Sequence, residues 1–165
     1  MTPWLLLDTA HIPGQHGAAS ALRLYQRGEE FSIKAGNSEL MNSRVHGSED
    51  ALAELACGRI AGRARPRVLI GGLGMGYTLA AALQQLRDDA EVVVAELVPA
   101  VVAWNRGALA HLAGHPLSDA RVTVRCGRTC QSAGVQELQR GHGPLDLAGA
   151  AGGELPETVS REQWA

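Results

Sequence analysis

The most informative run of residues is Val68-Leu69-Ile70-Gly71-Gly72-Leu73-Gly74-Met75-Gly76. A short, wholly apolar run such as residues 68–70 is typical of a strand that is buried on both faces of a parallel sheet. Residues 77–86 are rich in Ala, Leu and Gln, and this composition predicts a helix. A loop between a buried strand and a helix lies at the carboxyl edge of an open α/β sheet, where ligands bind.

The glycine spacing narrows the class of ligand. Gly72, Gly74 and Gly76 form the pattern G-x-G-x-G, whereas a dinucleotide fingerprint would need its third glycine at the position of Tyr77. No Gly-Lys-Ser/Thr sequence follows, which excludes a P-loop. The G-x-G-x-G spacing is carried by enzymes that bind S-adenosylmethionine. That ligand has no pyrophosphate, and the loop lies against its amino-acid tail and ribose.

An acidic residue follows at the distance that such a site needs. Val92-Val93-Val94 predicts a second buried strand, and Glu96 stands at its end, about 20 residues beyond the loop. A carboxylate there can accept hydrogen bonds from both ribose hydroxyls. The alternative to a binding site is an ordinary strand–helix turn with an incidental surface glutamate. The predicted cofactor-binding residues are Gly72, Gly74, Met75, Gly76, Glu96 and Leu97.

The order of elements predicts the fold class. Pro99 is well placed to begin a helix, and a third strand is predicted over residues 121–125. The order β-α-β-α-β implies a parallel sheet with right-handed crossovers. We therefore expect an α/β protein with an incomplete Rossmann-like sheet of the class I methyltransferase type. The apolar face of the second helix would comprise Val101, Trp104, Ala108 and Leu112, and the helix would end at Gly114 and Pro116.

The remaining segments predict a smaller β region and an irregular tail. Apolar and polar residues alternate before residue 42, with turns at Gly28 and Gly36-Asn37, which indicates hairpins. A helix with Ser48 as N-cap would end at Gly58. Beyond Gly127 the pattern fails, apart from a short helix over residues 136–140. The expected organisation is an N-terminal β region with a linking helix (1–58), a partial S-adenosylmethionine-binding domain (64–127) and an irregular, non-native or disordered tail (128–165).

Three parts of the chain carry a resemblance to a known family. They are residues 39–44 followed by Ser48-Glu49, residues 68–78, and residues 92–106 with 117–124. These stretches resemble the spermidine synthase-like branch of the class I S-adenosylmethionine-dependent transferases, whose C-terminal part is missing or replaced here. The resemblance covers about residues 20–127. It implies S-adenosylmethionine or decarboxylated S-adenosylmethionine as cofactor, and aminopropyl transfer to a polyamine or another nucleophile.

The sequence also departs from this family, which keeps two alternatives open. Aminopropyl-transferring members carry an acidic residue within the loop, where this chain has Leu73 and Met75, as in a methyltransferase. Arg128 stands where the family has an acidic residue that contacts adenine. The general base of the family has no recognisable equivalent, since Asp146 is the only aspartate in the tail. The alternatives are a methyltransferase on the same fold and a truncated, non-catalytic protein, and the catalytic residues stay unknown.

Composition limits the partners. A net charge of −2 over 165 residues argues against a protein that coats nucleic acid or an anionic membrane. Three cysteines form no even disulfide framework, and no segment predicts a signal peptide or membrane helix, so a cytoplasmic protein is expected. His111 and His115 have a zinc-like spacing without a third ligand, and we interpret them as helix-end residues rather than a metal site. Dimerisation would cover the exposed edge of the third strand.

Overall fold

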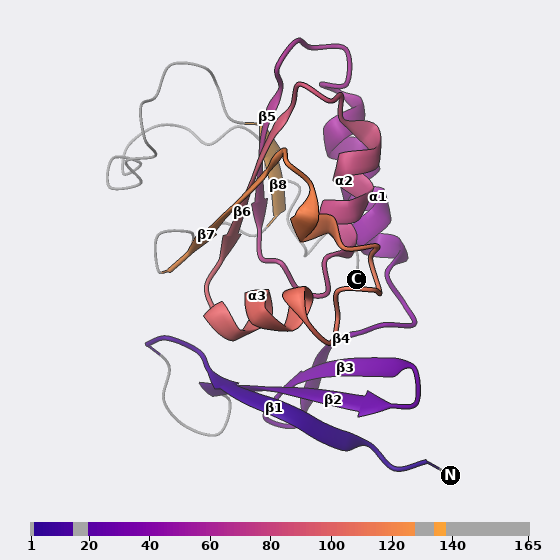
Figure 1. Ribbon diagram of the computed structural model, residues 1–165, viewed down its shortest axis with the longest axis vertical. Helices are drawn as coiled ribbons and strands as arrows, with labels where there is room; N and C mark the ends of the chain where they lie inside the picture. The colour runs from indigo at the N-terminus through magenta and orange to yellow at the C-terminus, as the bar shows by residue number, and fades with distance from the viewer. Residues whose placement is uncertain (1, 15–19, 128–133, 138–165) are drawn as a thin grey trace.

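The computed structural model describes residues 2–14, 20–127 and 134–137. These residues form two sheets, one antiparallel and one largely parallel, with three α-helices (Figure 1). The antiparallel sheet lies beyond the carboxyl edge of the parallel one, and helix α3 lies between them. The predicted α/β class with a preceding β region is therefore confirmed.

The N-terminal sheet is a four-stranded meander in the order β1-β2-β3-β4. Its two tight turns are where glycine predicts them, because Gly28 and Gly36 both have positive φ angles, of 60° and 58°. The predicted alternation also holds, since Leu24 lies opposite Ile33 and both are buried on the inner face. The strands are Leu5–His11, Ala21–Arg27, Glu30–Ala35 and Ser38–Asn42.

The second sheet has the order β7-β6-β5-β8, in which β5, β6 and β7 are parallel. Its strands are Arg67–Gly71, Glu91–Glu96 and Val122–Cys126, followed by β8 at Gly134–Glu137. Strand β8 pairs antiparallel with β5. The prediction of an irregular tail with a short helix over 136–140 missed this strand, because its residues carry no apolar run. The other tail residues lie outside the described part of the chain.

Helices α1 (Gly47–Gly58) and α2 (Tyr77–Gln85) pack together on one face of the parallel sheet. Val68, Val94 and Leu79 are at most 1% exposed at this interface. Burying side chains of this size contributes about 1.5–3 kcal/mol each. The core is therefore built on the helix-covered face, whereas Thr123 and Arg125 of the edge strand β7 are exposed.

Two helix boundaries differ from the predictions. Helix α1 begins at Gly47 with His46 as its N-cap residue, and Ser48 Oγ donates a hydrogen bond to Glu49 instead of capping the backbone. Helix α3 spans only Pro99–Arg106, because Gly107 leaves the helical conformation, with φ −118° and ψ −110°. The predicted apolar face therefore does not continue as a helix to Leu112. Turns and the 3-10 helix η2 (Pro116–Ser118) follow.

The start of β7 is fixed to the end of α2 by one arginine. Arg121 donates hydrogen bonds to Asp119 and to the backbone carbonyls of Leu86 and Arg87. The bonds from Arg121 lower the pKa of the Asp119 carboxyl below its ordinary value. Among the described residues, no helix is long and apolar enough to cross a bilayer.

Candidate functional site

The glycine loop joins the end of β5 to the start of α2. Gly72, Gly74 and Gly76 all adopt left-handed conformations, with φ angles of 86°, 55° and 85°. Side chains with a Cβ rarely take this conformation, so the three predicted glycines are required by the backbone itself. Gly76 is also the N-cap residue of α2. The chain turns sharply here at the carboxyl edge of the sheet.

Glu96 lies against this loop, as the strand order predicted. It is the last residue of β6, the neighbour of β5, and only 7% of it is exposed. Its Oε2 accepts a hydrogen bond of 2.8 Å from the Leu73 amide, and its Oε1 accepts one of 2.8 Å from the Val98 amide. The carboxylate therefore links the glycine loop to the segment that leads into α3.

The other two predicted site residues contribute differently. The side chain of Met75 is fully buried in the core, so this residue contributes its backbone, and not its side chain, to the surface of the loop. Leu97 follows Glu96 and is partly buried against the core. At the end of β7, the Gly127 amide donates a hydrogen bond of 3.1 Å to the Glu96 carbonyl. Three neighbouring parallel strands thus end around Glu96. Arg128 and Asp146, noted for their departure from the family pattern, lie outside the described residues.

Two residues at the loop were not predicted from the sequence. Asn105 of α3 is buried and donates hydrogen bonds to the carbonyls of Gly74, at 2.7 Å, and Val101, at 2.9 Å. Met41 of β4 accepts the Met75 amide through its sulfur, at 3.1 Å. A lone amide one turn after Val101 on a buried helix face was a usable signal for Asn105. No local pattern indicated Met41.

An aromatic contact joins the beginnings of α1 and α2 beside the loop. The His46 ring stacks on the Tyr77 ring, with centroids 4.2 Å apart and an interplanar angle of 15°. His46 Nδ1 lies 2.8 Å from an Asp50 carboxylate oxygen, and the Tyr77 hydroxyl donates to the Ser43 carbonyl at 3.3 Å. Burial raises the pKa of the Tyr77 hydroxyl, and the nearby Asp50 and Glu49 charges raise it further. This contact holds the N-terminal ends of the two helices together.

The antiparallel sheet is anchored on the other side of the site. The Trp104 indole of α3 donates a hydrogen bond of 2.7 Å to Asp8 of β1. His111 packs edge-on against Phe31, with ring centroids 5.8 Å apart. His111 and His115 lie beyond the end of α3, so they do not share a helix face as their spacing suggested. Within the described residues, no three His, Cys, Asp or Glu side chains form a group able to hold a metal ion.

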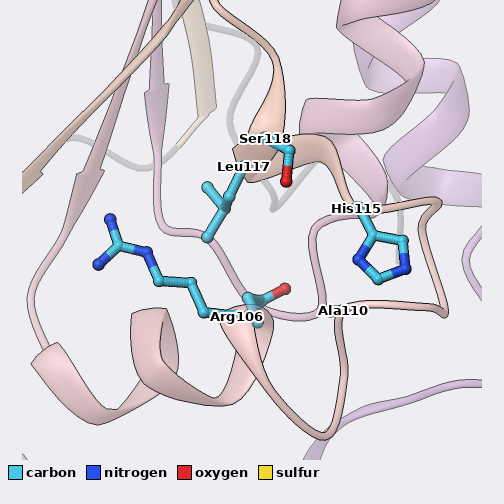
Figure 2. A pocket seen from close by; sticks show the side chains of 6 residues that line it. Arg106, Ala110, His115, Leu117 and Ser118 are labelled. Atoms are coloured by element: carbon cyan, nitrogen blue, oxygen red, sulfur yellow. The ribbon is translucent and has the colours of Figure 1, made fainter.

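Two cavities lie away from Glu96. One of about 210 Å³ lies between the C-terminal end of α3 and η2 (Figure 2), where its lining residues are Asn105, Arg106, Ala110, His115, Leu117 and Ser118. Another of about 420 Å³ opens at the amino ends of the parallel strands, beside Arg67 and Arg121. Neither is lined by a loop glycine or by Glu96. The candidate site is therefore defined by the hydrogen bonds of Glu96 and the loop.

Comparison with known proteins gives a result for the fold. By sequence, the chain matches no protein-family model and no curated protein. By structure, it is similar to a spermidine synthase in complex with the transition-state analogue AdoDATO, with a TM-score of 0.58 and 15% identity. It is also similar to the spermidine synthase from Thermotoga maritima, with a TM-score of 0.55 and 15% identity. In each case the match covers 75% of this chain and 41% of the other.

These matches show a spermidine synthase-like, methyltransferase-type fold. The expected family membership is supported at the level of the fold alone, because a sequence identity of 15% does not show membership of the family. The chain spans about two-fifths of the length of the solved structures that it matches.

Proposed function

We propose that this chain binds S-adenosylmethionine or decarboxylated S-adenosylmethionine at the rim formed by Glu96 and the glycine loop. The observation that carries the proposal is the hydrogen bond of 2.8 Å between the Glu96 carboxylate and the Leu73 amide within that loop. It brings an acidic strand end and a G-x-G-x-G turn together, as the resemblance to the spermidine synthase-like family implies. Ligands of open α/β folds bind at this edge of the sheet.

The bonding of Glu96 is compatible with a ribose. Each carboxylate oxygen accepts one backbone amide, and a carboxylate oxygen can accept a second bond. Two adjacent ribose hydroxyls would supply those second donors. Gly72 supports the same placement, since no atom of the described residues beyond its chain neighbours lies within 4 Å of the position that a Cβ would take there. The predicted cofactor residues thus leave open space beside the predicted ribose partner.

The proposed reaction class is group transfer from the sulfonium of the cofactor. The positive sulfur is already a good leaving group, so the protein mainly orients the nucleophile and removes a proton when the acceptor is an amine. By resemblance, the first candidate is aminopropyl transfer to a polyamine. The second candidate is methyl transfer, which Leu73 and Met75 favour because they leave the loop without a carboxylate for a cationic tail. No catalytic base is assigned among the described residues.

Two further parts of the proposal concern assembly and location. Strand β7 is an edge of its sheet, and a second copy of the chain covering it would remove an unpaired row of backbone groups. We therefore propose a homodimer, acting on a small-molecule acceptor in the cytoplasm, with no role for nucleic acid or membranes.

Calorimetry with the two cofactors tests the proposal. The wild-type chain, Glu96→Gln and the matched control Glu91→Gln are titrated with S-adenosylmethionine and with its decarboxylated form. Glu91 begins the strand that Glu96 ends, and its carboxylate accepts a hydrogen bond from Arg67 on the surface. We expect Glu96→Gln to weaken binding at least about tenfold, because a hydrogen bond to a charged group contributes about 1.5–3 kcal/mol. Glu91→Gln should bind as the wild type does.

The outcomes separate the candidates. Binding of only the decarboxylated form supports aminopropyl transfer, and binding of only the complete cofactor supports methyl transfer. Absence of binding by the wild-type chain to both ligands contradicts the proposal and favours a non-catalytic protein. Equal affinities for the wild type and Glu96→Gln would also contradict it, once circular dichroism shows that both are folded.

A further inference from the structure

The two halves of the glycine loop face different surroundings. Next to Glu96, the Gly72 side of the loop is open within the described part of the chain, where nothing but its chain neighbours lies within 4 Å of the position of a Cβ. The Gly74 side is covered by Met41, because a Cβ on Gly74 would lie 2.9 Å from the Met41 sulfur and 3.1 Å from its Cε. The loop continues from Leu73, whose amide bonds Glu96, to Gly74, so a ligand tail that follows the loop from a ribose at Glu96 would meet Met41.

The covered half of the loop offers backbone donors. The Met75 amide donates to the Met41 sulfur at 3.1 Å, and a thioether is a weak acceptor. The Gly74 amide donates no hydrogen bond to any described residue. Two donors in one turn match a carboxylate, which accepts strong hydrogen bonds. An ammonium group is itself a donor and cannot satisfy them.

The side chain of Met41 can change its conformation. It is partly buried, and methionine is unbranched with three rotatable bonds. The β3–β4 pairing is also irregular just here, since the register shifts between the pairs Ile33–Met41 and Lys34–Glu39. This shift leaves Leu40 as the extra residue beside Met41. The sulfur can therefore leave the loop through side-chain rotation while β4 stays paired.

We propose that Met41 competes with the tail carboxylate of S-adenosylmethionine for the Met75 amide, and so lowers the affinity of the loop for the complete cofactor but not for its decarboxylated form. Its sulfur holds the Met75 amide in the free protein, and the carboxylate of an S-adenosylmethionine tail replaces it. Decarboxylated S-adenosylmethionine has no carboxylate to offer and leaves Met41 in place. The backbone donors of the loop favour the complete, carboxylate-bearing cofactor, and the displacement of Met41 reduces that preference. This inference rests on the proposed adenosyl site at Glu96.

A Met41→Leu variant tests the inference by removing the sulfur acceptor while keeping a similar volume. Calorimetry compares S-adenosylmethionine, its decarboxylated form and 5′-methylthioadenosine, which has the adenosyl group without an amino-acid tail. We expect the variant to bind S-adenosylmethionine about 3- to 10-fold more tightly than the wild type, because the carboxylate no longer displaces a competing acceptor. Affinities for the other two ligands should change less than about twofold.

A control and a second variant keep the test decisive. Leu40→Met exchanges the same two residue types on the neighbouring, half-exposed position and should leave all three affinities unchanged. Met41→Ala, which also removes the bulk, should again favour S-adenosylmethionine selectively. The inference would be overturned if either Met41 variant gained affinity equally for all three ligands. It would also be overturned if neither variant gained affinity for S-adenosylmethionine. If the wild type binds none of the three ligands, the proposed adenosyl site itself fails, which is a separate result.

Discussion

The Gly72 and Gly76 ends of the glycine loop have nearly the same backbone angle and opposite surroundings. Gly72 has a φ of 86°, and no atom of the described residues beyond its chain neighbours lies within 4 Å of the position that a Cβ would take. Gly76 has a φ of 85°, and a Cβ there would lie 3.0 Å from Asn105 Oδ1 and 3.2 Å from Pro116 Cγ. One end is thus free to face a ligand, and the other is packed to hold the turn in place. Two glycines of one motif therefore have different roles, and the residues around each glycine distinguish them.

The largest effect is expected at the packed end. Gly76→Ala should destabilise the fold by about 2–4 kcal/mol, since it combines left-handed backbone strain of about 1–3 kcal/mol with a tight contact to Asn105 and Pro116. Chemical denaturation measures this change in the free energy of unfolding. A value below that of the matching Gly72 variant would break the distinction between the two ends.

The next largest effect concerns the side chain that supports the packed end. Asn105→Ala should cost about 1–3 kcal/mol of stability and weaken cofactor binding, because it leaves the partly buried Gly74 carbonyl without its donor. Arg106→Ala is the matched control on the same helix and lines the cavity of Figure 2. It should leave cofactor binding unchanged in calorimetry. Loss of binding in Arg106→Ala alone would move the site to that cavity.

A smaller stability change is expected at the open end. The methyl group of Gly72→Ala meets no atom of the other described residues within 4 Å beyond its chain neighbours, and the variant adds the strain of a left-handed alanine, about 1–2 kcal/mol. Its methyl group would enter the space proposed for the ligand, so the affinity for S-adenosylmethionine should fall more than the stability does. Parallel denaturation and titration of Gly72→Ala and Gly76→Ala check this contrast. The contrast fails if Gly72→Ala binds the cofactor as tightly as the wild type.

The smallest expected effect lies outside the glycine loop, at a buried thiol in α1, and concerns the pH dependence of stability. Burial raises the pKa of the Cys57 thiol in α1 from 9.0 to about 11. Since the raised pKa belongs to the folded state, the contribution is complete below pH 9 and is lost as the pH rises toward 11. We expect about 1 kcal/mol less stability at pH 10 from this thiol and no effect at pH 7. Cys57→Ala should remove that part of the pH dependence, and an unchanged pH profile would contradict the assignment.

The sequence predicted those features that follow from local order. Buried strands at residues 68–70 and 92–94 lie adjacent in a parallel sheet, so the meeting of Glu96 with the loop followed from topology. Met41 contacts the loop from the other sheet. A contact between residues so far apart in the sequence produces no periodic pattern of apolar residues from which it could be predicted. The early end of α3 at Arg106 and the pairing of β8 were likewise missed, because tertiary packing decides them.

The central claim is that the Glu96 carboxylate receives the ribose of an adenosyl ligand. The amides of Leu73 and Val98 report on it directly, because each donates to one carboxylate oxygen. A titration of the ¹⁵N-labelled chain with 5′-methylthioadenosine, followed by NMR, should shift both amide signals progressively to saturation. Saturable binding that leaves both signals in place and shifts instead Ala110 and Leu117, beside the cavity, would contradict the claim.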